Sequence, residues 1–171
     1  SSGLHSKQYI QCAKLLSYPK QAAIICSSLK DKITSSLKNI DIILSPALGG
    51  IVVGYEVGRQ LGKETIFAER VEKKLMLRRG FVIPANTNVL IVEDVITTGK
   101  SALECSNLVK INQAKLAGYA CIIDRTNSNS LIQEKIISQI KFHIETYKEN
   151  ELPEKLRKIP PTNPGSRNIS K

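Results

Sequence analysis

The chain has 171 residues, of which 42% are hydrophobic and 23% charged, as expected of one soluble globular domain spanning residues 1–171. No apolar run reaches the roughly 18 residues of a membrane-spanning helix, so we expect no membrane partner. The first residues lack the charged and apolar segments of a secretory signal, which favours a cytoplasmic protein.

The net charge of +10 points to an anionic partner, and the cations concentrate at 70–79 and 155–171. A nucleic-acid partner is disfavoured, because the sequence has no zinc-finger spacing and no RNA-binding aromatic motif among its five Tyr and three Phe. A basic surface is equally suited to a small, highly phosphorylated substrate, which it can attract and contact directly.

The four cysteines have apolar neighbours, and they form neither a Cys-x-x-Cys pair nor a Cys/His cluster with the spacing of a zinc site. We therefore expect no protein-bound metal there. The predicted buried thiols, in a reducing cytoplasm, are Cys12, Cys26, Cys105 and Cys121.

The first half of the chain alternates predicted helices with predicted strands. Pro19 begins an amphipathic helix, because proline is favoured in the first helical turn. Gly62 is placed to end the second helix. The elements are a helix over 19–36, a strand over 41–44 that ends at Ser45-Pro46, a helix over 49–60 and a strand over 65–68.

The second half continues the alternation after a basic segment, 69–80, which is predicted to be an exposed loop or a hairpin. The run from Val89 to Val92 is uniformly apolar, which indicates a strand covered on both faces. The further elements are a helix over 100–112, strands over 116–123 and 142–146, and an irregular proline-containing segment over 149–171.

Strands that alternate with helices predict an α/β fold, with a mainly parallel central sheet flanked by helices. In such sheets ligands bind beyond the carboxyl ends of the strands. The residue pairs that end or follow the predicted strands are therefore candidates for the site: Ser45-Pro46, Glu93-Asp94 and Asp124-Arg125.

The segment 89–101, Val-Leu-Ile-Val-Glu-Asp-Val-Ile-Thr-Thr-Gly-Lys-Ser, has the features of an anion site. A loop and a helix N-terminus follow the strand and offer unpaired N–H groups, and Gly99 allows a phosphate to approach closely. The two carboxylates suit sugar hydroxyls or a metal-bound sugar. A nucleotide-binding P-loop is excluded, because its first glycine would fall on Asp94. A plain strand and capped helix is disfavoured, since paired acids are costly to bury without partners.

All thirteen positions resemble the signature with which type I phosphoribosyltransferases bind 5-phosphoribosyl-1-diphosphate (PRPP). By that resemblance, residues 97–101 would cradle the 5-phosphate, while Glu93 and Asp94 would face the ribose hydroxyls. The implied PRPP-binding residues of this segment are Glu93, Asp94, Val95, Ile96, Thr97, Thr98, Gly99, Lys100 and Ser101.

Further segments are similar to the shorter bacterial form of orotate phosphoribosyltransferase. They are 2–6 with Tyr9, and then 45–50, 67–70, 77–81, 124–125 and 164–167. The resemblance covers almost the whole chain and implies the type I fold with a small hood region. It also implies a pentosyltransferase of UMP biosynthesis, which transfers ribose 5-phosphate from PRPP to orotate and releases orotidine 5′-phosphate and pyrophosphate.

The chain departs from the family's pattern in three places. A further N-terminal stretch, which helps to cover the orotate site, is missing, so the hood is expected to be incomplete. Many members carry Lys where this chain has Gly49, so pyrophosphate binding would depend more on backbone groups and on the basic loop. The Cys-x-x-Cys pair of many shorter members is replaced at 152–155, so no metal is expected there.

The resemblance assigns the base and the basic loop their roles. Arg125 would bind the carboxylate of orotate bidentately, with Thr97 near the base; a structural salt bridge from Arg125 to Asp124 or Glu93 is the alternative. In the family the loop reaches into the neighbouring subunit's site and neutralises pyrophosphate, which implies a homodimer with shared sites. Arg70, Lys73 and Lys74 would bind PRPP there, and a solvated hairpin is the alternative for the lysines. The predicted catalytic residues are Asp94, Glu93, Arg70 and Lys74.

Mg²⁺ is the implied cofactor, bound mainly through oxygens of PRPP, as is common for magnesium at phosphate substrates. Two other functions stay open at this point. One is a phosphoribosyltransferase for another base, against which Arg125 and the segment 2–6 argue. The other is a PRPP-sensing regulator that binds nucleic acid, which would need an extended basic face away from the pocket.

Overall fold

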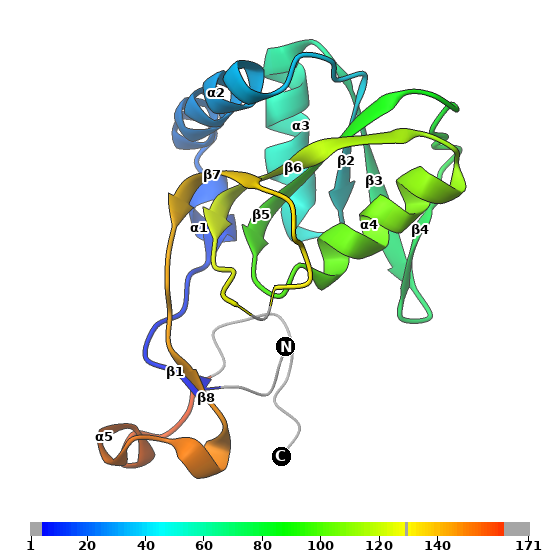
Figure 1. Cartoon of the computed structure of the whole chain (residues 1–171). Helices are drawn as coiled ribbons and strands as arrows, with labels where there is room; N and C mark the ends of the chain where they lie inside the picture. Colours follow the sequence, from blue (N-terminus) through cyan, green and yellow to red (C-terminus); the bar gives the residue numbers. More distant parts are fainter. Residues whose placement is uncertain (1–4, 129, 163–171) are drawn as a thin grey trace. The chain divides into compact units, whose positions relative to one another are not determined.

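The computed structural model describes residues 5–128 and 130–162 (Figure 1). It divides into two compact units, of which the larger comprises residues 12–142 and the smaller contains the residues on either side. Two segments that carried part of the resemblance, 2–4 and 164–167, lie outside the described residues.

The larger unit is built on a six-stranded sheet with the order β4-β3-β2-β5-β6-β7. Every neighbouring pair is parallel except β3 and β4, which form an antiparallel hairpin. This arrangement confirms the predicted α/β class with a mainly parallel sheet. The strands are β2 (Ile42–Pro46), β3 (Glu64–Val71), β4 (Lys74–Leu77), β5 (Asn88–Ile96), β6 (Lys115–Asp124) and β7 (Ile136–Lys141).

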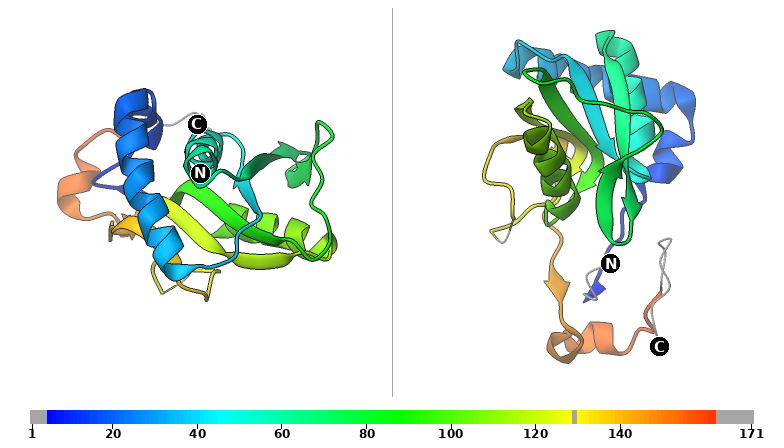
Figure 2. Two further views of the ribbon diagram at one scale, coloured as in Figure 1. Left: turned by 90° about the horizontal axis from the view of Figure 1, so that it is seen from above. Right: turned by 90° about the vertical axis from the view of Figure 1, so that its right-hand side faces the viewer.

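Helices cover both faces of this sheet. The helices α2 (Pro19–Ser36) and α3 (Gly49–Leu61) lie on one face and α4 (Lys100–Ile111) on the other (Figure 2). All three agree with the predicted spans to within one residue at each end. Gly62 follows α3 in the left-handed conformation, with φ of 64°, as predicted for a helix-ending glycine. The short α1 (Cys12–Leu16) was not predicted, because five residues show no helical period.

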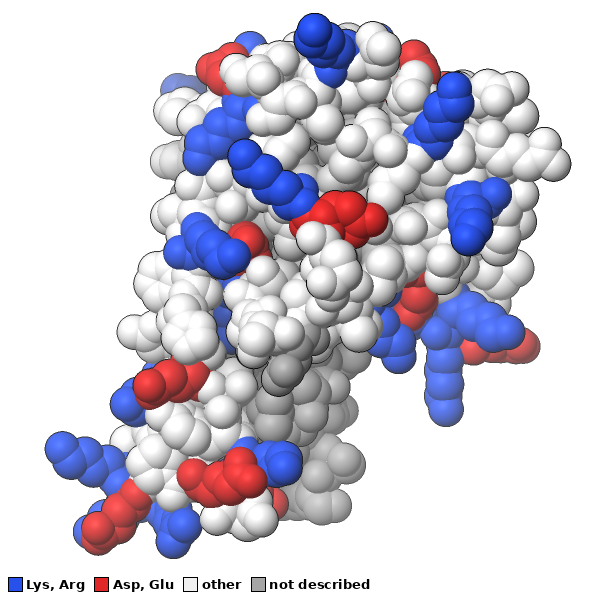
Figure 3. Space-filling model, in the orientation of Figure 1, with Lys and Arg blue, Asp and Glu red and all other residues white. Residues whose placement is uncertain are grey.

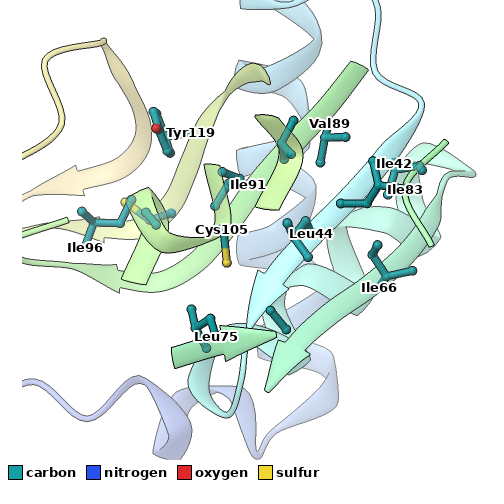
Figure 4. Packing of buried hydrophobic residues seen from close by; sticks show 14 of the residues in the cluster. Ile42, Leu44, Ile66, Leu75, Ile83, Val89, Ile91, Ile96, Cys105 and Tyr119 are labelled. Carbon is teal, nitrogen blue, oxygen red and sulfur yellow. The ribbon is translucent and has the colours of Figure 1, made fainter. Parts of the chain in front are cut away.

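The core on the α4 side of the sheet consists of alternate strand residues that pack against that helix (Figure 4). Ile42 and Leu44 of β2 lie beside Val89 and Ile91 of β5, and Cys105 of α4 packs among them. The remaining strand residues face α2 and α3, so β5 is buried on both faces, as its uniform apolar run predicted. All four cysteines are buried free thiols, as predicted.

The outer edge of the sheet is formed by β7, which packs beside α2. The Nζ atom of Lys32 on α2 donates to the backbone oxygens of Ser138 and Gln139, at 2.8 and 3.2 Å. Gln139 also donates through Nε2 to the Ile25 oxygen, at 3.4 Å.

The predicted strand over 142–146 is wrong. The strand lies at 136–141 instead, because parallel pairing with β6 fixes its register, and the amide of Phe142 bonds the oxygen of Asp124 where the strand ends. In the smaller unit, β8 (Thr146–Tyr147) pairs antiparallel with β1 (His5–Ser6). The segment 149–171 is not irregular throughout, since it contains a 3₁₀ turn (Glu149–Glu151) and α5 (Glu154–Arg157).

No helix in the described part of the chain is long and apolar enough to cross a bilayer.

Candidate active site

The two adjacent acids lie inside the last part of β5, because this strand continues to Ile96, four residues past the apolar run. Successive strand residues point to opposite faces. The Asp94 carboxylate accordingly lies beside the start of α3, whereas Glu93 lies near the thiol of Cys105 in α4. The structure therefore brings both acids to one end of the sheet but directs them toward different helices.

Gly49, the first residue of α3, makes room for the Asp94 carboxylate. A Cβ atom at position 49 would lie 2.7 Å from Oδ1 and 2.8 Å from Oδ2 of Asp94, too close for any side chain without displacement. The positive end of the α3 dipole is thus placed against an acid, which favours the ionised form. The pKa of Asp94 is nevertheless raised, because burial outweighs hydrogen bonds from the backbone N–H groups of Val95 and Asp94.

Glu93 is the more deeply buried acid, with only 7% of its surface exposed. Burial raises the pKa of Glu93 to about 8, and the neighbouring charge of Asp94 contributes in the same direction. Glu93 therefore retains its proton near neutral pH and can donate a hydrogen bond as well as accept one. The two acids are chemically distinct even though they are adjacent in the sequence.

The loop between β5 and α4 consists of Thr97, Thr98 and Gly99. Thr97 and Thr98 are exposed, whereas Gly99 is buried and has a φ of 79°. A Cβ atom at Gly99 would lie 2.7 Å from Cγ1 of Ile132, so only glycine fits without rearrangement. The amide of Leu131 donates to the Thr98 oxygen at 3.0 Å, which ties this loop to a second loop that sequence reasoning missed.

Arg125 lies immediately beside this loop. It follows the last residue of β6, and its amide donates to the oxygen of Ile96 at 2.8 Å. The backbone positions of Thr97 and Arg125, both predicted to contact the base, are thus adjacent. Asp124, considered as an ion-pair partner for Arg125, accepts hydrogen bonds from the N–H and Oγ1 of Thr126, at 2.8 and 2.6 Å.

The basic segment 69–80 is folded as the β3–β4 hairpin, one of the two predicted forms. It projects from the same end of the sheet as the β5–α4 loop, and basic and acidic side chains gather over its tip (Figures 1 and 3). Glu69 pairs with Arg78 and Arg79, at 3.1 and 2.6 Å, and Arg70 pairs with Glu104 of α4 at 2.8 Å. Intramolecular acids therefore balance three of its five cations, more than its local sequence indicated.

A pocket of about 390 Å³ connects this hairpin with the segment before α3. Ala47 and Leu48, which are joined by a cis peptide bond, form one wall. Arg70, Arg78 and Arg79 also line the pocket, and we therefore call it the basic pocket. The complete lining is Ala47, Leu48, Ile51, Phe67, Glu69, Arg70, Arg78 and Arg79.

The phosphoribosyl transferase domain family matches residues 14–151 of the chain. The orotate phosphoribosyltransferase of Chlorobaculum parvum is 46% identical over 167 residues, which cover 98% of this chain and 86% of that protein. This chain belongs to the orotate phosphoribosyltransferase family. The assignment confirms the resemblance found in the sequence.

Solved structures of phosphoribosyltransferases confirm the fold. An adenine phosphoribosyltransferase from Thermoanaerobacter pseudethanolicus superposes with a TM-score of 0.67 at 19% identity, covering 78% of this chain and 88% of the other. An orotate phosphoribosyltransferase from Aeropyrum pernix superposes with a TM-score of 0.64 at 18% identity, covering 78% of each chain.

Two contributions to this site could not be found from the sequence. Glu104 bonds to Arg70 from 34 residues away, and Ile132 packs on Gly99 from a loop with no recognisable pattern. Across residues 5–128 and 130–162, no three His, Cys, Asp or Glu side chains gather so that they could hold a metal ion by themselves.

Proposed function

We propose that the chain transfers the ribose 5-phosphate of PRPP to orotate, giving orotidine 5′-phosphate and pyrophosphate in UMP biosynthesis. The observation that carries the proposal is the adjacency of Arg125 to the β5–α4 loop. This arrangement joins a phosphate-binding loop with a cation suited to a carboxylated base. The high identity to orotate phosphoribosyltransferases over nearly the whole chain supports the same substrates.

PRPP would bind along the end of β5 and the loop that follows it. Backbone N–H groups of residues 97–101 and the N-terminus of α4 would bind the 5-phosphate, helped by the hydroxyls of Thr97, Thr98 and Ser101. Val95 and Ile96 would contact the sugar, and Glu93 and Asp94 its hydroxyls. A protonated Glu93 carboxyl can both donate to and accept from ribose hydroxyls, and the carboxyl oxygens of Asp94 can accept from them.

In the reaction, the bond from the ribose C1 to pyrophosphate breaks and a bond from C1 to the base nitrogen forms, while the N–H proton of the base leaves to solvent. The transition state carries positive charge on the ribose, so catalysis needs positioning and electrostatics more than covalent chemistry. Asp94 and Glu93 would act beside the sugar. Arg70 and Lys74, with Lys73, would stabilise the departing pyrophosphate.

Mg²⁺ fits this donor set, because carboxylate oxygens are ligands that it prefers and few protein ligands are needed beside a phosphate substrate. Oxygens of PRPP would hold it, and Asp94 would contact it through water. When bound, it would neutralise charge on the pyrophosphate leaving group.

Base specificity tests the proposal directly. The protein is mixed with PRPP, Mg²⁺ and each of orotate, adenine, hypoxanthine and uracil, and turnover is followed for each base. Orotate should be consumed and the other three should not. Faster turnover of one of those three would show a phosphoribosyltransferase for another base. Binding of PRPP without any turnover, together with binding of nucleic acid, would support a regulator instead.

Arg125→Ala tests the orotate subsite. Removing a charge-assisted bidentate contact should weaken orotate binding by roughly 2–4 kcal/mol. The KM for orotate should rise far more than the KM for PRPP. Equal weakening of both substrates would indicate a structural role for Arg125.

The proposal includes a cytoplasmic homodimer whose active sites are shared between subunits. Three large apolar side chains are exposed here: Leu48, which precedes α3 and lines the basic pocket, and Val52 and Tyr55 on α3, at 83%, 49% and 64%, which supports a protein contact on this surface. The state in solution can be measured by light scattering. A monomer that retains full activity would contradict shared sites.

Subunit complementation tests whether the hairpin acts in the partner's site. One inactive variant carries Arg70→Ala and Lys74→Ala, and the other carries Asp94→Asn. If the hairpin acts in the partner, mixed dimers contain one intact site, and subunit exchange should restore activity. If exchange is demonstrated and activity stays absent, the hairpin serves its own subunit.

A further inference from the structure

The guanidinium of Arg70 is held in place by two acceptors. Its Nη1 atom donates to the backbone oxygen of Lys73 at 2.6 Å and to Oε2 of Glu104 at 2.8 Å. The amide of Leu75 donates to the same Oε2 atom at 3.3 Å. One carboxylate oxygen on α4 therefore fixes both strands of the hairpin.

These contacts leave part of the guanidinium for a ligand. Both of the described hydrogen bonds are made by Nη1, whereas Arg has five N–H donors on three nitrogens. The edge formed by Nε and Nη2 is the geometry with which Arg binds phosphate oxygens in pairs. Arg70 also lines the basic pocket, together with Ala47 and Leu48, and its side chain is one-third exposed.

Glu104 is well placed to fix this geometry relative to the rest of the site. It lies one turn into α4, the helix that begins directly after the β5–α4 loop. The thiol of Cys105, the next residue on α4, lies near Glu93 as well as near Glu104 and Arg70, so one of the two β5 acids and the ion pair lie around the same position in the core. A rigid helix thus connects the loop for the 5-phosphate with the cation of the hairpin.

The turn of the hairpin also depends on these contacts. Glu72 and Lys73 have positive φ angles of 47° and 68°, a conformation that costs non-glycine residues roughly 1–2 kcal/mol each. The bonds from Arg70 to Lys73 and from Leu75 to Glu104 lie on either side of this turn and offset part of that cost.

We propose that Glu104 is a positioning residue, which holds the guanidinium of Arg70 at the rim of the basic pocket so that it can bind the diphosphate of PRPP. This role rests on the proposed function. Glu104 itself does not touch the substrate. It acts through Arg70, and through no other cation of the hairpin.

The test compares Glu104→Gln with a matched control, Glu56→Gln. Glu56 also forms a 2.7 Å ion pair with an arginine on a helix, but its partner Arg59 lies on α3 outside the pocket lining. Binding of inorganic pyrophosphate with Mg²⁺ is measured by calorimetry. Glu104→Gln should weaken it about tenfold, within the range of coupled polar contacts. It should raise the KM for PRPP similarly and leave the KM for orotate unchanged, whereas Glu56→Gln should change neither.

A double-mutant cycle with Arg70→Ala identifies the route of the effect. In the Arg70→Ala background, Glu104→Gln should weaken pyrophosphate binding no further. Three outcomes would each overturn the proposal. Glu104→Gln could still weaken pyrophosphate binding without Arg70, or it could leave pyrophosphate binding unchanged in the wild-type background. It could also tighten pyrophosphate binding, as expected if Glu104 competed with pyrophosphate for Arg70. Thermal unfolding checks that the variants are folded.

Arg70→Lys covers the case in which Glu104→Gln does not fold. Lysine can keep one bond to Glu104 but lacks the second nitrogen for the diphosphate. The affinity for pyrophosphate should therefore fall while the Tm stays the same. An unchanged affinity for pyrophosphate would overturn the proposal. Because pyrophosphate binding needs no base, these results do not depend on orotate. If orotate is not turned over but Glu104 and Arg70 show the predicted coupling in pyrophosphate binding, only the proposed function is contradicted.

Discussion

The β5–α4 segment and the β3–β4 hairpin bring charge to the same end of the sheet in opposite ways. Glu93 is buried and Asp94 is partly buried, and desolvation raises the pKa of both. The cations of the hairpin are largely exposed, and three of them are held by Glu69 and Glu104.

This difference shows what sets the chemistry of each region. In the buried segment, the position of the backbone decides which face each acid reaches and how strongly it holds its proton. In the hairpin, geometry depends on single ion pairs that water and salt can weaken. Substitutions in the first region should therefore have the larger effects, and the predictions below test that order.

The largest effect is expected for Asp94→Asn. It removes a charge beside the bound sugar at nearly constant volume, so kcat should fall by about 10²–10³, as for other single electrostatic groups. The control is Asp41→Asn at the start of β2, where the Asp41 carboxylate accepts the Asn88 amide at 2.7 Å, at the other end of the sheet. Asp41→Asn should keep wild-type turnover. Full activity of Asp94→Asn would show that the sugar site has been misplaced.

The second prediction concerns the pH dependence of stability. Glu93 has its pKa raised from 4.5 to about 8 on folding, so the native state keeps a proton that the unfolded chain has released. Stability should therefore fall as pH rises from 4.5 to about 8, by up to about 1.4 kcal/mol per pH unit from this group. Urea unfolding across this window should show a flatter profile for Glu93→Gln. Parallel profiles for the two proteins would contradict the buried, protonated state.

The third prediction separates backbone strain from packing at Gly99. Gly99→Ala and Gly80→Ala both place alanine at a positive φ, 79° and 75°. Only position 99 adds a collision, with Ile132, because nothing lies within 4 Å of a Cβ at Gly80. Gly80→Ala should lower the free energy of unfolding by roughly 1–2 kcal/mol, and Gly99→Ala by about 1–3 kcal/mol more. Equal losses of unfolding free energy in the two variants would mean that the loop containing Ile132 moves away from the added methyl group at little cost.

The smallest effect is expected at the turn of the hairpin. Lys73→Gly removes the strain of a positive φ and should stabilise the fold by at most about 1 kcal/mol, since glycine also gains freedom in the unfolded chain. The KM for PRPP adds a second result. An increase would assign the pyrophosphate contact to Lys73, and an unchanged value would leave that role to Lys74.

The helices and the central strands could be predicted because their signals, runs of apolar residues and the residues that begin or end an element, lie close together in the sequence. Pro19 began α2, Gly62 followed α3, and the apolar run of β5 indicated its burial on both faces. The strand at 136–141 was missed because its pairing with β6, rather than its own alternation, sets its position. The local sequence pattern does not predict the position of a strand when pairing with a neighbouring strand determines it.

The site, like the fold, was predictable only where its residues lie in local sequence motifs. The segment 93–101 and Arg125 lie next to each other, since both follow parallel strands that end at one edge. The opposite directions of Glu93 and Asp94 follow from strand alternation once the strand is known to continue to Ile96. The pairing of Arg70 with Glu104 has no local signature, because it joins a hairpin to a helix 34 residues later.

The bonds from Lys32 to the edge of β7 have a consequence for the behaviour of the protein at high concentration. An exposed edge strand is a template onto which a strand of another molecule can add. Successive carbonyls of a strand point to opposite sides, so only one of the two oxygens that the Lys32 ammonium contacts, those of Ser138 and Gln139, faces the open edge. An incoming strand would have to displace a cation to reach that acceptor. Lys32→Met would uncover it, and the sheet would then be open to growth by addition of further chains.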